Sequence, residues 1–158
     1  MSTARILVVG STMMDLISYA KVIPNAGETL VGDRFQMGFG GKGANQAVQA
    51  ARFGAPVAMV NAVGDDAYGA SHLANFVKEG IDTRWMRTVP GSSGVAPIWV
   101  DANGINRIII VPGANNETDP ALLYPDMVLA SIVFACCHQC APPARYGAAS
   151  FAASSRDR

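Results

Sequence analysis

The sequence has little charge and no excess of either sign. Lys and Arg together number 12, Asp and Glu also number 12, and charged residues make up 15% of the 158 residues. Because nucleic acid and anionic membranes attract a basic protein surface, neither is expected as a main partner. No apolar run approaches the roughly 18 residues of a membrane span, and residues 1–5 do not have the form of a signal peptide. These absences favour a cytoplasmic protein.

Cysteine is also scarce, and its three copies lie close together at Cys136, Cys137 and Cys140, which is not a disulfide framework. The residues after Val133 contain no Ile, Leu, Val or Met. Residues 135–158 have no helical or strand periodicity, so an unstructured tail is expected there. By contrast, 50% of the whole chain is hydrophobic, which is enough for one domain with a core.

The sequence does contain an alternation of short apolar strands and amphipathic helices. Strands or extended segments are expected at residues 5–9, 56–60, 81–88 and 131–134, and helices at about 43–53 and from Ala67 to a stop at Gly80. The expected buried stripes are Ala44, Ala47, Val48 and Ala51 in the first helix, and Ala67, Ala70, Leu73 and Val77 in the second. This alternation predicts βαβ units and an α/β fold with a parallel sheet.

Two hairpins are expected within lid segments at about 12–38 and 94–112. The first turns at residues 24–27, and the second turns at Asn103-Gly104, a strong hairpin signal between two strand-rich runs. Pro97 lacks a backbone donor and therefore predicts an edge strand or a bulge. Because neither hairpin is placed to join the parallel sheet, we expect a four-stranded lid over the ends of the parallel strands.

The most distinctive stretch is Gly-Phe-Gly-Gly-Lys-Gly-Ala-Asn-Gln at residues 38–46. Glycines between an extended segment and a helix let a ligand approach the backbone closely. Lys42 and Asn45 lie three apart at the helix start, so both can point at one ligand beside free N–H groups. Asp15 follows the first strand, near the strand ends where α/β folds bind ligands, although it can also be a solvated hairpin residue.

Two other interpretations of residues 38–46 stay open. The spacing Gly38-x-Gly40-x-x-Gly43 matches the dinucleotide-binding fingerprint. That fingerprint should follow the first strand of a βαβ unit, with an acidic residue about 20 positions on. Alternatively, the stretch is a glycine-rich helix start without a ligand. A P-loop is excluded, because Lys42 is followed by Gly43 rather than by Ser or Thr.

Five segments in order resemble the ribokinases, which are carbohydrate kinases of the phosphofructokinase-B type. These segments are residues 10–15, 24–29, 38–46, 63–66 and 113–116. The resemblance covers about residues 4–133 and implies transfer of the γ-phosphoryl of ATP to the 5-hydroxyl of ribose or 2-deoxyribose. It also implies a Rossmann-like α/β body, a β-sheet lid that often forms a homodimer, and the use of Mg²⁺ and a monovalent cation such as K⁺.

The resemblance further implies that two segments bind the sugar. Their substrate-binding positions are Met13, Met14 and Asp15 in the first segment, and Gly41, Lys42, Gly43, Ala44 and Asn45 in the second. In this scheme Asp15 and Asn45 hydrogen-bond to sugar hydroxyls, and Lys42 adds a charged donor.

The chain departs from the ribokinase pattern beyond its first half. Ribokinases continue into a second half that carries a Gly-Ala-Gly-Asp motif with the catalytic base, the nucleotide site and the monovalent-cation site, and this sequence has no such motif. A pocket glutamate normally follows the strand near Phe134, where this chain has Ala135. We therefore expect residues 1–134 to be the N-terminal part of a carbohydrate kinase domain whose C-terminal half is missing. Such a chain is a truncated, inactive kinase or a non-catalytic sugar-binding or lid-dimerising fragment.

Overall fold

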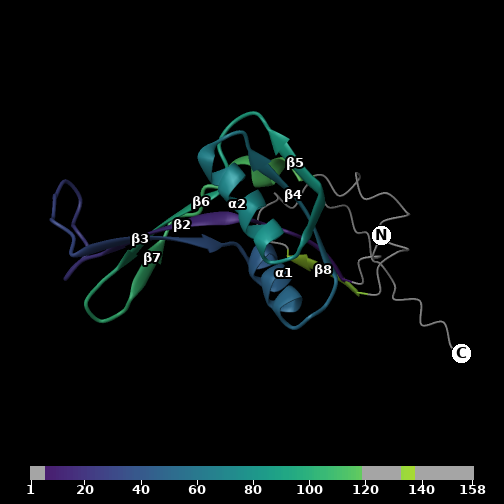
Figure 1. Cartoon of the computed structure of the whole chain (residues 1–158). Coiled ribbons are helices and arrows are strands. Elements are labelled where there is room, and N and C mark those ends of the chain that lie inside the picture. The colour runs from purple at the N-terminus through teal and green to yellow at the C-terminus, as the bar shows by residue number, and fades with distance from the viewer. Residues whose placement is uncertain (1–5, 119–132, 138–158) are drawn as a thin grey trace, which may run out of the picture.

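The computed structural model describes residues 6–118 and 133–137, which form two sheets and two α-helices (Figure 1). In chain order the elements are β1 (Ile6–Gly10), β2 (Met13–Tyr19), β3 (Arg34–Gly40), α1 (Lys42–Arg52), β4 (Val57–Gly64), α2 (Ala67–Lys78), β5 (Asp82–Val89), β6 (Val95–Val100), β7 (Asn106–Ile108), the 3₁₀ helix η1 (Gly113–Glu117) and β8 (Val133–Cys137). In this part of the chain, neither helix is long and apolar enough to cross a membrane.

The first sheet is parallel throughout and has the strand order β5-β4-β1-β8. The path from β1 through α1, β4 and α2 to β5 consists of the predicted βαβ units, so the predicted α/β fold is confirmed. The last strand runs to Cys137, and the expected strand end at Phe134 is wrong by three residues. Main-chain pairing with β1, for example Val9 with Cys136, extends the strand beyond Phe134, because backbone hydrogen bonds do not depend on the side chains. The rest of the expected tail lies outside the described residues.

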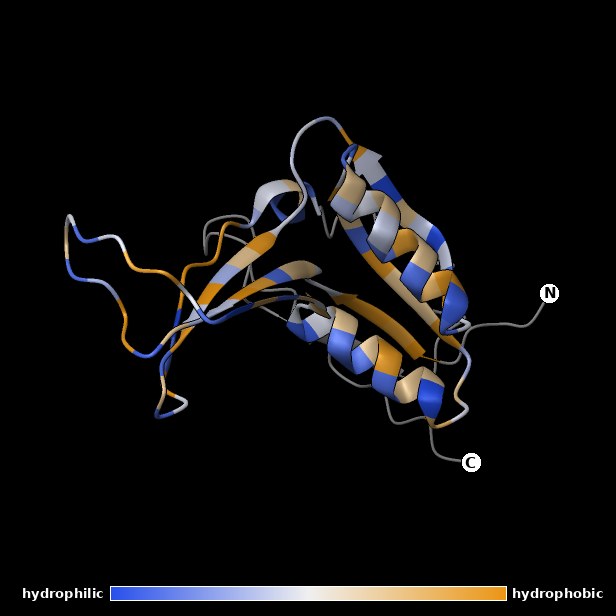
Figure 2. Cartoon of the chain, turned by 60° about the vertical axis from the view of Figure 1, so that its left-hand side comes forward, coloured by the Kyte–Doolittle hydropathy of each residue, from blue (hydrophilic) through white to orange (hydrophobic). Residues whose placement is uncertain are grey.

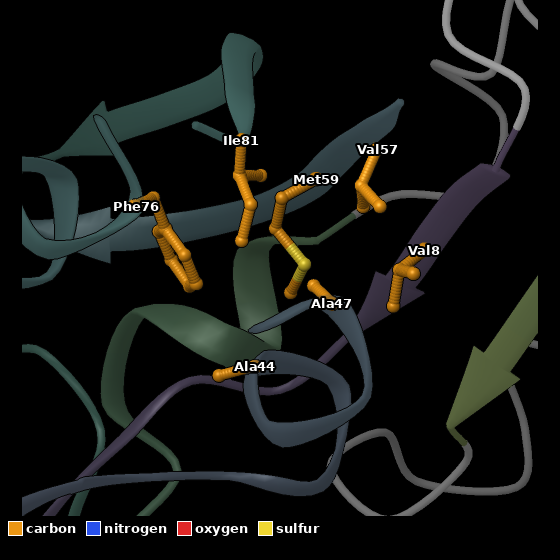
Figure 3. Close-up of a cluster of buried hydrophobic side chains, with 7 residues drawn as sticks. All are labelled: Val8, Ala44, Ala47, Val57, Met59, Phe76 and Ile81. Carbon is orange, nitrogen blue, oxygen red and sulfur yellow. The ribbon is translucent and has the colours of Figure 1, made fainter. Parts of the chain in front are cut away.

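Both helices pack on the same face of the parallel sheet, and Figure 3 shows the side chains between them. This cluster consists of Val8, Ala44, Ala47, Val57, Met59, Phe76 and Ile81. In Figure 2 the strands behind the helices are mainly hydrophobic, whereas the helices have hydrophilic residues on their outer sides. A second buried cluster, Leu7, Val9, Ala58 and Val60 with Trp85, alternates with the first along the strands and lies on the opposite face. A sheet buried on both faces explains the continuous apolar runs of β1 and β4.

The predicted buried stripe is confirmed for α1 and wrong for α2. In α1, Ala44 and Ala47 are buried and Val48 and Ala51 are partly buried. In α2 the buried residues are Gly69, His72 and Phe76, whereas the side chain of Val77 is 65% exposed. The spacing of aliphatic residues did not predict this face of α2, because two of its three buried residues are Gly69, which has no side chain, and His72, which counts as polar.

The second sheet has the order β3-β2-β6-β7 and is the predicted lid. Each hairpin pairs antiparallel, β2 with β3 and β6 with β7, and the two hairpins are joined by parallel pairing of β2 with β6. Figure 1 shows this sheet projecting from the body that contains α1 and α2. Because β2 follows β1 after only two residues, the lid starts at the carboxyl end of a central strand of the parallel sheet.

Pro97 does not lie on an edge strand, and no bulge accompanies it. It lies in β6, which has β2 on one side and β7 on the other, and the register on the β7 side is constant from Val95 to Val100. The Ile109 N–H donates to the Pro97 carbonyl at 3.0 Å, but proline has no N–H to complete the pair. The missing bond interrupts the ladder at the point where β7 ends.

Candidate functional site

The residues that connect β1 to the lid lie directly on the start of α1. The Ala44 N–H donates to the Ser11 carbonyl at 3.1 Å. Gly41 has φ 95°, and a Cβ added there would lie 2.5 Å from the Ser11 oxygen. Backbone therefore packs on backbone at this point, with glycine required by both the conformation and the space. The N–H groups of Lys42 and Gly43 lie ahead of the first intrahelical hydrogen bond, so this helix start can offer donors to a ligand.

The carboxylate of Asp15 lies against the chain just before α1. Antiparallel pairing places Asp15 opposite Gly38, and a Cβ added to Gly40 would lie 2.4 Å from both carboxylate oxygens. Burial raises the pKa of Asp15 above its usual value. Within residues 6–118 the ion pairs are Arg52–Glu79 and Arg84–Asp82, neither of which involves this carboxylate. Because Asp15 is half-buried, the alternative that it is a fully solvated hairpin aspartate does not apply.

The eight predicted substrate-binding positions fall into two groups in the structure. Met13, Met14, Gly43 and Ala44 are buried and take part in packing, while Gly41 is half-buried. Asp15 is half-buried, and Lys42 and Asn45 are exposed. The pairing of β2 with β3, in which Met13 lies opposite Gly40, brings the two segments close together. The polar side chains of the site that are not fully buried are consequently those of Asp15, Lys42 and Asn45.

The dinucleotide-binding interpretation lacks the context that it needs. The glycines at residues 38–43 span the end of β3, which belongs to the lid, and the start of α1, whereas the fingerprint should follow the first strand of a parallel βαβ unit. The connection after β1 is Ser11-Thr12 and leads to β2, not to a helix. The glycine-rich stretch therefore connects a lid strand to α1 and does not occupy the strand-to-helix turn of a Rossmann-type pyrophosphate site.

A buried cluster of amides and hydroxyls lies behind the site. The Thr12 N–H donates to Asn115 Oδ1 at 2.9 Å, and Asn115 Nδ2 donates to the Thr12 carbonyl at 2.8 Å. Asn61 Nδ2 donates to Thr12 Oγ1 at 2.8 Å and to Asn115 Oδ1 at 3.0 Å. The Thr118 hydroxyl donates to Asn61 Oδ1 at 2.5 Å. The cluster connects Asn61, in a central strand of the parallel sheet, to Thr12 and Asn115, which lie in two chain segments at the base of the lid.

A second polar cluster fastens the start of β6 to α2. Asp66 is the N-cap of α2 and accepts from the Gly69 N–H at 2.8 Å. It also accepts from the Ser93 N–H at 2.8 Å and from the Ser93 hydroxyl at 2.6 Å. Burial alone would raise the pKa of Asp66, but the hydrogen bonds from Ser93 and Gly69 outweigh it and lower that pKa. A Cβ on Gly69 would lie 2.1 Å from the Gly64 oxygen, so the elements here are in close backbone contact.

Sequence reasoning assigned no role to Asn61, Asn115 or Ser93. One signal was available for Asn61, which is the only polar residue in the run Val57–Val63 and therefore a candidate for a buried hydrogen-bonded amide. Residues 113–116 match the ribokinase pattern, but the pattern alone predicts no role for Asn115. The partners of these side chains are up to 103 positions away in the chain, so no local pattern indicates them.

Residues 3–137 match the pfkB family of carbohydrate kinases. The chain is 48% identical over 116 residues to a deoxyribokinase of Salmonella typhi, covering 73% of this chain and 38% of that protein. It is 50% identical over 118 residues to a ribokinase of Bacillus subtilis, covering 74% of this chain and 40% of that protein. The chain thus spans less than half the length of these curated relatives.

Solved ribokinase structures have the same fold. The ribokinase of Giardia lamblia superposes with a TM-score of 0.80 at 34% identity, covering 91% of this chain and 44% of that chain. The Arabidopsis thaliana ribokinase, solved as a complex with ribose and ATP, gives a TM-score of 0.76 at 29% identity, with 88% and 46% of the two chains covered. Together with the geometry of the parallel sheet, its lid and the glycine-rich helix start, these similarities show that the chain belongs to the pfkB family of carbohydrate kinases.

Proposed function

We propose that this chain forms the sugar-binding and lid part of an enzyme that transfers the γ-phosphoryl of ATP to the 5-hydroxyl of ribose or 2-deoxyribose. The observation that carries the proposal is the position of the Asp15 carboxylate, which lies against Gly40 immediately before the start of α1. Family membership and the similarity to both ribokinases and a deoxyribokinase support it. The choice between the two sugars stays open, because relatives of both kinds match equally well.

In this proposal, the sugar is held both by a hydrogen-bond acceptor and by hydrogen-bond donors. Asp15 accepts hydrogen bonds from sugar hydroxyls, and its burial strengthens such bonds by excluding competing water. Lys42 and Asn45 approach from the first turn of α1 and donate to hydroxyl oxygens, and Asn45 can also accept. The buried Met13 and Met14 side chains support the β2 backbone behind Asp15. Binding and orientation of the acceptor sugar are thus the part of the reaction assigned to this chain.

The transfer step needs groups that this sequence does not contain. It has no Gly-Ala-Gly-Asp motif, and a general base typically contributes about 10²- to 10⁴-fold to a rate. Among residues 6–118 and 133–137 there is no cluster of three or more His, Cys, Asp or Glu side chains that would hold Mg²⁺. ATP is proposed as the phosphoryl donor by analogy with the Arabidopsis thaliana complex. We therefore assign no chemical step to this chain by itself.

Two functions remain to be separated, a complete kinase activity and a non-catalytic sugar-binding fragment. Titration calorimetry of the 158-residue chain with ribose and with 2-deoxyribose, each with and without ATP and Mg²⁺, distinguishes them. Sustained heat from turnover in the presence of ATP supports an active kinase. Saturable sugar binding without turnover supports the fragment, and this is the result that we expect.

Replacing Asp15 by asparagine is expected to weaken sugar binding about tenfold, because a hydrogen bond to a charged acceptor is worth about 1.5–3 kcal/mol and the amide retains part of it. Calorimetry with the better of the two sugars measures the change in Kd. Asp33 provides a matched control, since it is an exposed aspartate just before β3 and Asp33→Asn should leave Kd unchanged. Equal affinities of Asp15→Asn and the unchanged chain would remove Asp15 from the sugar site.

We also propose that two copies of the chain associate through the lid. Phe35, Met37 and Phe39 alternate along β3 and are 60%, 55% and 46% exposed, so they line one face of the strand. The strand β3 is at the edge of the lid sheet, where unpaired backbone groups and exposed apolar side chains favour association. A second copy presents the same apolar row and is the partner proposed here.

The substitution Phe35→Asp is expected to convert a dimer into a monomer at micromolar concentration, because it places a charge in the apolar row. Sedimentation velocity measures the change. Gln36→Asp is the matched control, since its side chain alternates to the other face of β3 and the dimer should persist. A monomeric unchanged chain, or a dimer that tolerates Phe35→Asp, would contradict lid-mediated association.

A further inference from the structure

The chain leaves the parallel sheet at Ser11-Thr12, which belongs to neither sheet. At this point the backbone of Thr12 pairs with a side chain instead of a neighbouring strand. Its N–H donates to Asn115 Oδ1 at 2.9 Å, and its carbonyl accepts from Asn115 Nδ2 at 2.8 Å. A single carboxamide thus makes both hydrogen bonds that a paired strand residue would make.

The Asn115 carboxamide is itself fixed in orientation. Its Nδ2 also donates to the Pro112 carbonyl at 2.7 Å, and its Oδ1 accepts from Asn61 Nδ2 at 3.0 Å. The residue is only 4% exposed. Because Asn61 lies in β4, its hydrogen bond ties the orientation of the amide to the body. Thr12 is therefore held in a position that the parallel sheet determines.

The surrounding backbone makes room for this amide. A Cβ on Gly94 would lie 2.1 Å from Asn115 Nδ2 and 2.6 Å from Met13 Sδ, so glycine is needed where the second hairpin begins. The Met14 N–H donates to the Gly94 carbonyl at 2.9 Å. The two hairpins of the lid consequently meet at Asn115, one through Thr12 and the other through Gly94.

We propose that Asn115 is a positioning residue for the sugar site. It fixes the direction in which β2 leaves the body, and thereby sets the place of the Asp15 carboxylate relative to the start of α1. The link is short, because Asp15 is three residues beyond Thr12, and Ser11 on the preceding side accepts from the Ala44 N–H of the helix. Asn115 touches neither the sugar nor the reacting atoms in this scheme. The inference rests on the proposed sugar-binding function.

Amide hydrogen exchange measured by NMR on the 158-residue chain tests the positioning itself. In Asn115→Ala, the amides of Thr12 and Met14 should exchange at least about tenfold faster, while those of Val8 and Met59 in the parallel sheet keep their rates. The matched control is Asn116→Ala, which changes the exposed neighbouring asparagine. Unchanged rates at Thr12 and Met14, or uniform acceleration that includes Val8 and Met59, would overturn the inference.

The substitution Asn115→Asp gives a second test, because it keeps the shape and the acceptor oxygens but cannot donate to the Thr12 carbonyl. It also serves if Asn115→Ala does not fold. With both variants fully folded, Kd for the better bound of ribose and 2-deoxyribose should weaken about fivefold in Asn115→Asp and remain unchanged in Asn116→Asp. Faster exchange at Thr12 with unchanged sugar affinity would overturn the role at the sugar site. If the unchanged chain binds neither ribose nor 2-deoxyribose, the proposed function fails for this chain, while the exchange rates still decide whether Asn115 positions β2.

Discussion

Replacing Gly43 by alanine is expected to lower the free energy of unfolding by about 1–2 kcal/mol. A Cβ at this position would lie 2.6 Å from the carbonyl carbon of Gly10 and 2.9 Å from the nitrogen of Ser11, both of which are backbone atoms. Overpacking of this kind costs about 1–3 kcal/mol and sometimes more, while alanine recovers about 1 kcal/mol of helix propensity. Because the contact is with backbone at the end of β1, no side-chain rotation relieves it. Urea unfolding followed by circular dichroism measures the loss.

The same glycine-rich stretch provides the control for this experiment. Gly38 has no atom within 4 Å of an added Cβ, and its φ is not positive. Gly38→Ala should therefore change stability by no more than about 0.5 kcal/mol. Similar losses in Gly38→Ala and Gly43→Ala would show that glycine is needed here for chain flexibility instead of close packing of α1 on β1.

Acidification from pH 7.5 to pH 5.0 is expected to lower the free energy of unfolding by about 2 kcal/mol through His72 alone. This side chain is 1% exposed, and neither ring nitrogen has a hydrogen-bond partner among the described residues. Burial lowers the pKa of His72 to about 4, against the opposing effects of the Asp66 charge and the Met13 carbonyl. The ring lies edge-on to Phe39 with centroids 5.2 Å apart, and 6.2 Å from the stacked ring of Phe76.

The direction of this pH effect follows from the two protonation states of His72. Above the ordinary pKa of 6.5, the imidazole is neutral in both the folded and the unfolded chain, and stability is at its full value. As the pH falls towards 4, the unfolded chain binds a proton that the folded chain excludes, so stability is lost progressively. The carboxylates of Asp66, Glu79 and Asp82 have lowered pKa values and titrate below this window.

Urea unfolding at both pH values measures the loss, with His72→Leu as the comparison. The leucine variant cannot take up the proton, so its stability should change little between pH 7.5 and pH 5.0. His138→Gln leaves the buried imidazole in place and should retain the slope of the unchanged chain. An equal loss in the unchanged chain and in His72→Leu would show that another group causes the pH dependence.

Local pattern was sufficient for much of this fold. The apolar run of β1, the strand–helix alternation and the Asn103-Gly104 turn predicted a parallel sheet with a four-stranded lid, because each of these signals acts through neighbours in the chain. The glycine-rich stretch and Asp15 were both candidates for a ligand site, because glycines let a ligand approach the backbone and a carboxylate accepts hydrogen bonds. The sequence pattern gave a wrong prediction for the buried face of α2 and for the position of Pro97 in its sheet. In both cases the residues that pack or pair there come from distant segments of the chain.

The sequence by itself indicated the family, the order of the elements and the residues of the proposed sugar site. Only the tertiary structure decided how those residues are held. The Asp15 carboxylate meets Gly40 through strand pairing, and the base of the lid is fixed by Asn115, whose partner Thr12 is 103 positions away. Such contacts depend on the three-dimensional path of the chain, because a buried amide must find every one of its hydrogen-bond partners and no local pattern specifies which groups they are.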